Sequence, residues 1–187
     1  MTQAGTSRRI VWVMGPSGAG KDSVMAWARE RLDGRARVVF GHRYATRPPD
    51  PRHPGEIAVG PGEFALRAAE GLFAFAWDAW DVRYAVGAEV RDWAARGLAV
   101  VVSGSRECFV ASVHRDAGVL PVLITASAAV RARRLRARAR EAEPAIVARL
   151  ARGDALVPSH PALGTIANDG ALEEAGARLV EVLRGVG

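Results

Sequence analysis

A glycine-rich segment, Gly15 to Lys21, carries the clearest chemical signal in the sequence. It fits the pattern G-x-x-x-x-G-K and lies between an apolar run, Ile10 to Met14, and a predicted helix, Asp22 to Leu32. Small residues there let backbone N–H groups converge on a phosphate, and the helix N-terminus and the lysine add positive charge. A glycine-rich turn that binds no nucleotide is the alternative. We expect the following residues to hold the β- and γ-phosphates of ATP, with Lys21 catalytic: Gly15, Pro16, Ser17, Gly18, Ala19, Gly20, Lys21, Asp22 and Ser23.

Asp22 stands where Ser or Thr usually follows the lysine of such a loop. A carboxylate can hold Mg²⁺ directly or through water, because this ion prefers oxygen ligands and retains several waters. An aspartate in a first helical turn can equally serve only to complement the helix dipole. Both readings stay open, and Ser23 is a second candidate for the magnesium site.

Arginine supplies nearly all of the positive charge in a chain with a formal net charge of +6 and a pI of about 10.8. It is concentrated in two stretches, Arg43 to Arg52 and Arg131 to Arg140. Aromatic residues are not interleaved with either stretch, and no nucleic-acid-binding motif is readable, so we expect no nucleic-acid partner. A run of charge is usually a solvated helix face, and we expect this for most arginines of the second stretch.

The length of 187 residues, with 49% hydrophobic and 25% charged residues, is typical of a single globular domain. No apolar run approaches the ~20 residues of a membrane helix, and the first nine residues do not resemble a signal peptide. We therefore expect a cytoplasmic protein without a membrane partner. The single cysteine, Cys108, is expected to be a small core residue.

Apolar runs alternate with helical patterns, which indicates an α/β fold around a mostly parallel sheet. Proline-rich residues 48–61 are expected to form a loop without regular structure. Strands are expected at 10–14, 37–41, 72–77, 82–86, 98–103, 119–125 and 163–167. Helices are expected at 22–32, 63–70, 88–96, 105–116, from Ser127 to before Pro144, and at 171–183.

Several local motifs together resemble the guanylate-kinase-like branch of P-loop kinases over almost the whole chain. Besides the phosphate loop, they are Thr46-Arg47-Pro48, Tyr84 after Trp77, Arg134-Leu135 with Arg138, and Arg149-Leu150. The resemblance implies a three-layer P-loop kinase fold in one domain, residues 1–187, with an acceptor-binding insertion at about 42–86 and an arginine-rich lid at about 131–152. It also implies that Arg138 and Arg149 of the lid are catalytic.

Guanine recognition in that branch depends on acidic side chains, and these are replaced here. Counting from Tyr84 and from Gly104 places Phe75 and Val101 at the two acidic positions. An apolar group would leave the N–H donors of guanine unpaired, which disfavours guanylate as the acceptor.

The combination of Gly15 to Ser23, Phe73 to Trp77, Val100 to Arg106 and Asn168-Asp169-Gly170 is more particular. It resembles the ribose 1,5-bisphosphate phosphokinases of phosphonate catabolism, in which an aspartate after the P-loop lysine is usual. Ser103 departs from the asparagine expected there. The resemblance implies transfer of the γ-phosphoryl group of ATP to ribose 1,5-bisphosphate, giving 5-phospho-α-D-ribose 1-diphosphate.

Arginine suits the binding of a phosphosugar because its planar fork binds phosphate bidentately and stays charged. Arg47 is the main candidate for an acceptor phosphate, followed by Arg52, Tyr84 and Arg106, and Arg43 is a further candidate. Glu56 and Asp78 could contact a metal or a ribose hydroxyl, or be exposed loop carboxylates.

Two other functions of the same fold, and the state of assembly, are left open by the residues. One function is a nucleoside monophosphate kinase, and the other is a non-catalytic binding module, against which the intact Gly20 and Lys21 argue. A homodimer is one assembly that the sequence allows.

Overall fold

A central sheet of five parallel strands forms the body of the protein in the computed structural model, which describes residues 8–32, 34–51, 53, 55–79, 81–137 and 142–186. The strand order is β2-β7-β1-β8-β9. The bounds are β1 Ile10–Met14, β2 Val38–Phe40, β7 Ala99–Ser103, β8 Val119–Thr125 and β9 Gly164–Ala167. Both faces of β1 are buried, which explains its continuous apolar run. The expected parallel sheet is confirmed.

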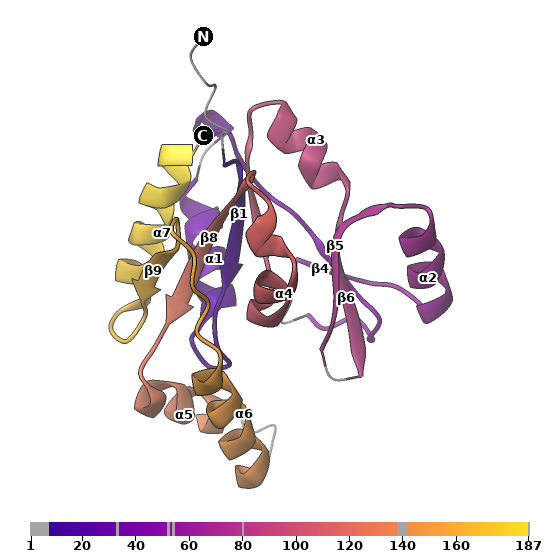
Figure 1. The fold of residues 1–187 in the computed structure, drawn as a ribbon. Coiled ribbons are helices and arrows are strands. Elements are labelled where there is room, and N and C mark those ends of the chain that lie inside the picture. Colours follow the sequence, from indigo (N-terminus) through magenta and orange to yellow (C-terminus); the bar gives the residue numbers. More distant parts are fainter. Residues whose placement is uncertain are drawn as a thin grey trace.

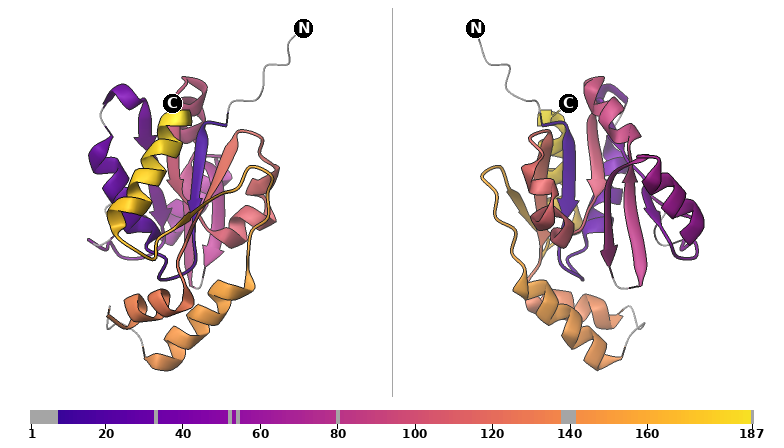
Figure 2. Two further views of the ribbon diagram at one scale, coloured as in Figure 1. Left: turned by 90° about the vertical axis from the view of Figure 1, so that its left-hand side faces the viewer. Right: turned by 45° about the vertical axis from the view of Figure 1, so that its right-hand side comes forward.

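Helices cover both faces of this sheet and complete three layers (Figures 1 and 2). On one face, α1 (Lys21–Arg31) and α7 (Leu172–Val186) pack over Val11, Val13 and Val101. On the other face, α3 (Glu89–Ala95) and α4 (Arg106–Ala111) enclose a second core around Trp12 and Phe109. The short 3₁₀ helices η1 (Gly34–Ala36) and η2 (Val113–Arg115) connect elements of the body.

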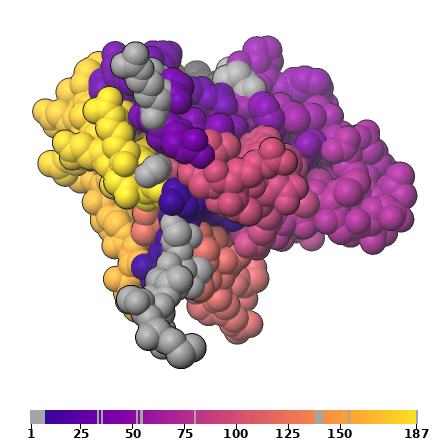
Figure 3. All heavy atoms as spheres, turned by 90° about the horizontal axis from the view of Figure 1, so that it is seen from above, coloured from indigo at the N-terminus to yellow at the C-terminus, as the bar shows by residue number. Residues whose placement is uncertain are grey.

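A second sheet of four strands, in the order β4-β3-β6-β5, stands beside the first. Its strands are β3 (Arg43–Ala45), β4 (Glu56–Ala58), β5 (Phe73–Ala79) and β6 (Val82–Gly87), and α2 (Pro61–Ala69) connects β4 to β5. In Figure 3 this lobe, coloured purple to magenta, projects to one side of the body. The lobe lies within the expected acceptor-binding insertion.

Two helices, α5 (Ala128–Ala137) and α6 (Glu143–Ala155), form a separate layer beyond the carboxyl ends of the parallel strands, at the bottom of Figure 1. They overlap the expected lid, and this layer with the preceding Ser127 is called the lid below. Ser127 precedes α5, and its Oγ accepts a hydrogen bond from the backbone N–H of Val130 at 3.4 Å. Pro144 lies in the first turn of α6, where a missing N–H is harmless. The helix expected from Ser127 to before Pro144 is found as α5, and its last expected positions, 138–141, lie outside the described residues. Helix α6, which Pro144 starts, was not expected.

Two predictions from the sequence are wrong, and one strand was not predicted. The proline-rich segment contains β4, and its last residue, Pro61, begins α2, because the prolines flank a short edge strand and start a helix. Strand β3 was not expected, because three residues with polar neighbours give no periodic signal. The helix expected at 105–116 ends at Ala111 and continues as η2.

No helix in the described part of the chain is long and apolar enough to cross a membrane. Cys108 is buried, as expected, in the core around Trp12. Burial raises the pKa of its thiol, which fits a packing role rather than a reactive one.

The contact between Trp12 and Gly104 couples the core to the edge of the sheet where the phosphate loop lies. A β-carbon on Gly104 would lie 1.9 Å from Cε2 of Trp12, whose side chain is fully buried. We predict that Gly104→Ala lowers the free energy of unfolding by about 2 kcal/mol or more, because the indole cannot move without displacing the core. Urea denaturation measures this.

Gly185→Ala is the matched control, since a β-carbon there meets no atom within 4 Å and the residue lies in α7. Alanine favours a helix more than glycine does, so this variant is expected to lose no stability. Equal stability of the two variants would contradict the packing account.

Candidate active site

The phosphate loop connects β1 to α1 at the carboxyl edge of the parallel sheet. Gly18 and Gly20 have positive φ angles of 84° and 82°, which side-chain-bearing residues rarely adopt. A β-carbon on Gly18 would also lie 2.9 Å from the carbonyl oxygen of Arg131. The two glycines therefore allow the turn that the phosphate-binding pattern predicts, and α1 begins at Lys21 immediately after it.

Asn168 and Arg134 hold the loop from outside. Nδ2 of Asn168 donates to the carbonyl oxygen of Ala19 at 2.7 Å, and Nη1 of Arg134 donates to the same oxygen at 3.4 Å. Asn168 is only 2% exposed. The sequence pointed to Asn168 only as part of a family motif, because its position at the end of β9 next to the loop depends on sheet order.

Asp169, the next residue, fixes the start of the lid. Its Oδ1 accepts a hydrogen bond from the backbone N–H of Ser127 at 2.7 Å. This hydrogen bond lowers the pKa of the Asp169 carboxyl. The Asn-Asp pair therefore joins the phosphate loop to the first residues of the lid.

The ammonium group of Lys21 contacts one acidic side chain, Asp22, and one neutral side chain, Ser103 at the end of β7. Its Nζ donates to Oδ1 of Asp22 and to Oγ of Ser103, both at 2.5 Å. Burial lowers the pKa of the lysine, and the Asp22 carboxylate opposes this shift. Lys21 in turn holds the pKa of Asp22 well below its ordinary value. Ser103, which replaces the expected asparagine, is thus part of the site.

Glu56 joins two arginines of the neighbouring lobe. Its Oε2 accepts hydrogen bonds from Nε and Nη2 of Arg43 at 3.0 and 2.7 Å, and its Oε1 accepts one from Nε of Arg47 at 2.5 Å. Only 7% of the Glu56 side chain is exposed, so the interpretation as an exposed loop carboxylate is wrong. The Glu56 carboxylate raises the pKa of Arg47, although burial opposes this.

Arg43 also contacts Ser103 at the end of β7, beside Lys21. Its Nη1 donates to Oγ of Ser103 at 3.3 Å, so one hydroxyl is shared by Arg43 and Lys21. The guanidinium groups of Arg43 and Arg47 lie 5.0 and 5.9 Å from the centre of the Tyr84 ring. The structure therefore brings together Lys21, Arg43, Arg47 and Tyr84.

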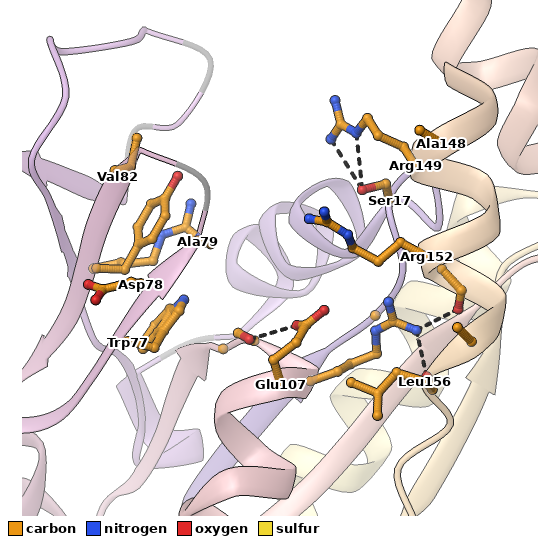
Figure 4. Close-up of a pocket in the computed structure, with 18 of the residues that line it drawn as sticks. Ser17, Trp77, Asp78, Ala79, Val82, Glu107, Ala148, Arg149, Arg152 and Leu156 are labelled. Carbon is orange, nitrogen blue, oxygen red and sulfur yellow. Dashed lines mark hydrogen bonds between the residues drawn. The ribbon is translucent and has the colours of Figure 1, made fainter. Parts of the chain in front are cut away.

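The lid contributes Arg149, which lies over the phosphate loop. Its Nε and Nη2 donate to Oγ of Ser17 at 3.3 and 3.2 Å, as Figure 4 shows. Arg138, the other lid arginine expected to be catalytic, and Arg52, an expected acceptor residue, lie outside the described residues. The position of Arg149 suits contact with a phosphate held by the loop.

Arg106 lies at the junction of the lid and the body. It is 7% exposed, and its Nη1 donates to the carbonyl oxygens of Gly153 and Leu156 at 2.6 and 2.7 Å. These contacts, drawn in Figure 4, place its guanidinium on the end of α6. Arg106 still lines the cleft, so its expected role at the acceptor stays a prediction.

Two arginines of α5 do not lie on a solvated helix face as expected. Arg131 was expected on a solvated face but is only 2% exposed, and its Nε donates to the carbonyl oxygen of Ala126 at 3.1 Å. Arg134 contacts the phosphate loop instead of solvent alone. Arg133 does lie exposed. A charge pattern alone cannot show which side of a short helix faces the loop.

Phe75 and Val101 do not face the cleft as the comparison with guanine-reading positions assumed. Phe75 is 9% exposed and packs edge-on against Trp12, with ring centres 5.1 Å apart. Val101 is fully buried in the core under α1. Trp77 instead lines the cleft and stacks on Tyr84 at 5.8 Å. These two residues therefore give no direct information on the acceptor.

The cleft between the lobe and the lid has a volume of about 1010 Å³. In Figure 4 it is bordered by Trp77, Asp78 and Val82 on one side and by Arg149 and Arg152 on the other. An adjoining space of about 420 Å³ is lined by the phosphate loop, Arg43, Arg47, Tyr84 and Arg149. The arrangement can hold anionic groups from two sides at once.

A divalent cation would depend on substrate oxygens for much of its coordination. Within the described residues, no group of three or more His, Cys, Asp or Glu side chains is arranged to hold a metal ion. Asp22 and Ser23 do lie side by side at the start of α1 and both line the space at the phosphate loop. One carboxylate with substrate phosphates and waters is an ordinary magnesium environment.

His53 lies between two carboxylates, with Nδ1 3.9 Å from Oδ2 of Asp22 and Nε2 3.9 Å from Oδ2 of Asp50. Burial lowers its pKa, although Asp22 opposes this. The unfolded chain therefore binds a proton at His53 more readily than the folded chain, so this contribution to stability is present above about pH 6.5 and falls at lower pH.

We predict that His53→Gln loses less of its free energy of unfolding between pH 7.5 and 5.5 than the wild type. Urea denaturation at each pH measures the difference. His42→Gln, which changes an exposed histidine, is the control and should follow the wild type. Identical pH dependence in all three proteins would contradict the assignment.

Comparisons with known proteins agree with this geometry. No protein-family model matches the chain. The chain is 45% identical over 175 residues to the ribose 1,5-bisphosphate phosphokinase PhnN of Thiobacillus denitrificans, covering 94% of this chain and 92% of that protein. It is 44% identical over 182 residues to the PhnN protein of Burkholderia pseudomallei, covering 97% and 98%.

Among solved structures, the chain is similar in fold to a guanylate kinase from Anaplasma phagocytophilum. The TM-score is 0.69 at 16% sequence identity, covering 94% of this chain and 84% of that chain. This likeness confirms the expected fold class. The identities and coverage of the PhnN proteins show that the chain belongs to the ribose 1,5-bisphosphate phosphokinase family.

Proposed function

We propose that this protein is an ATP-dependent kinase that phosphorylates ribose 1,5-bisphosphate to 5-phospho-α-D-ribose 1-diphosphate. The observation that carries the proposal is the pair of facing cation groups: Lys21 and Arg149 at the phosphate loop, and Arg43 and Arg47 on the lobe opposite. The choice of ribose 1,5-bisphosphate as the acceptor rests on the relatives that are named as ribose 1,5-bisphosphate phosphokinases. The reaction is expected in the cytoplasm.

In this reaction an oxygen of the acceptor's C1 phosphate attacks the γ-phosphorus of ATP. The bond from that phosphorus to the β–γ bridging oxygen breaks, and ADP leaves with the electron pair. The attacking oxygen is already anionic at neutral pH, so no side chain has to remove a proton. The protein therefore acts mainly by aligning the two phosphates and balancing charge.

Lys21 is the residue best placed to balance charge on the donor. In this structure its ammonium group is held by Asp22 and Ser103. The phosphates of ATP would offer it stronger anionic partners, and Asp22 would then be available to a magnesium ion. Bound Mg²⁺, held through Asp22 and Ser23, would supply further positive charge to the β- and γ-phosphates.

Arg149 supports the same phosphates from the lid. Its guanidinium lies on Ser17, and α6 also lines the cleft between the lobe and the lid. A lid that covers the donor excludes water, which limits hydrolysis of ATP, and it brings a cation to the transferred group. We place Arg138 in the same role by resemblance.

We predict that Arg149→Met lowers kcat by about 100-fold or more while the fold is retained, because a preorganised cation is lost where negative charge develops. Arg133→Met is the matched control: it makes the same chemical change on an exposed position of the lid and should leave the rate nearly unchanged. A coupled assay of ADP release measures both. Equal rates in the two variants would remove Arg149 from the mechanism.

The acceptor is tested by the same assay with AMP, GMP, UMP, CMP and ribose 1,5-bisphosphate. We expect turnover of the phosphosugar to exceed that of every nucleotide. Strong turnover of a nucleotide without turnover of the sugar would reject the proposed function in favour of a nucleoside monophosphate kinase. Loss of all activity in Lys21→Ala, with folding retained, would argue against a non-catalytic module.

A further inference from the structure

The side chain of Arg43 is less exposed than those of the other described arginines in the lobe formed by the four-stranded sheet and α2. Its side chain is 17% exposed, compared with 27% for Arg47. The pairing of β3 with β4 places Arg43 directly opposite Glu56, which explains its two hydrogen bonds to one carboxylate oxygen. The guanidinium is therefore fixed before any ligand binds.

The two arginines lie at different depths along the lobe. In the pairing of β3 with β6, Arg43 lies opposite Val86, near the end of β6. Arg47 follows Thr46, whose backbone N–H donates to the carbonyl oxygen of Arg83, near the start of β6. Both line the cleft in front of the phosphate loop. We therefore call Arg43, near the end of β6, the inner end of the arginine pair, and Arg47, near the start of β6, its outer end.

A third space, of about 350 Å³, opens behind this inner end. Arg43 borders it, together with Ser103, His53, Phe40 and the first turns of α1, and Arg47 does not. It shares Asp22, Ser23, Arg43 and His53 with the space at the phosphate loop, so the two adjoin. An acceptor whose reacting phosphate lies near Arg47 and Tyr84 and that extends towards this third space would pass Arg43.

We propose that Arg43 binds the second, non-reacting phosphate of the acceptor and so determines specificity for a bisphosphorylated sugar. This inference rests on the proposed function and assigns to one residue the choice between acceptors with one and two phosphates. Arg47 and Tyr84 then serve the reacting phosphate.

The physical basis is that two fixed, partly buried cations share one carboxylate, that of Glu56. Glu56 balances one of the two arginines, so the pair keeps a net positive charge. An acceptor without a second phosphate leaves this charge unmatched, and groups that lose charged hydrogen bonds discriminate strongly between ligands. Because Glu56 and Ser103 already orient the guanidinium, little side-chain entropy is lost when phosphate binds.

The test compares ribose 1,5-bisphosphate with α-D-ribose 1-phosphate, which has the same reacting phosphate but no second one. For each protein, kcat/KM is measured with both, and the inhibition constant of ribose 1-phosphate is used if it is a poor acceptor. We expect Arg43→Met to lower kcat/KM for the bisphosphate about 10- to 100-fold. The value for ribose 1-phosphate should hardly change.

Three further variants keep the test decisive. Arg43→Met combined with Glu56→Gln removes the carboxylate that the single change leaves unbalanced, and Arg43→Lys keeps the charge without the planar fork. Both are expected to retain the selective loss, Arg43→Lys to a smaller extent. Arg178→Met, on an exposed position of α7, is the matched control and should behave as the wild type.

The outcomes separate this inference from the function on which it rests. A loss confined to the bisphosphate supports the inference. Equal losses with both acceptors, or no loss with either, would overturn it while leaving the kinase function intact. If the wild type does not phosphorylate ribose 1,5-bisphosphate at all, the proposed function fails, and this inference with it.

Discussion

Three cationic side chains lie close together in one cleft of this protein, and two carboxylates stabilise this arrangement. Lys21, Arg43 and Arg47 follow one another along a chain of contacts through Ser103 and Glu56, and Asp22 balances the lysine. Cations this enclosed would destabilise the fold if they had no partners. Glu56 therefore supports both the structure of the lobe and the readiness of its arginines.

The same contacts join the two sheets. Ser103 ends a strand of the parallel sheet, whereas Arg43 begins a strand of the mixed sheet, and one hydrogen bond connects them. Asn168 and Asp169 link the third part, the lid, to the phosphate loop. Each of the three parts thus contributes to a site that no part could form alone, as phosphoryl transfer between two bound substrates requires.

The geometry of the phosphate loop could be predicted from the sequence because its signals are local. The phosphate loop, the strand before it and the helix after it occupy one continuous segment, and the glycine positions follow from backbone geometry. Arg149 was identified through its spacing in a family pattern, and the structure places it on Ser17 of the phosphate loop; its catalytic role stays a prediction.

The acceptor side was harder to predict because it depends on strand pairing. Glu56 meets Arg43 only because β4 pairs with β3, and neither strand gives a periodic signal. Counting along the chain assigned Phe75 and Val101 to the cleft, although Phe75 packs into the core around Trp12 and Val101 into the core under α1. Ser103 and Asn168 became informative only when sheet order placed them beside the loop.

The central claim is that a phosphate group, not a hydroxyl or a base, receives the phosphoryl group. ³¹P NMR of the protein with ATP, Mg²⁺ and ribose 1,5-bisphosphate tests this most directly. The account predicts that the γ-signal of ATP is replaced by ADP and by two mutually coupled signals of a sugar diphosphate, while the 5-phosphate signal persists. Formation of ADP with only inorganic phosphate, or a new monoester without coupled diphosphate signals, would contradict it.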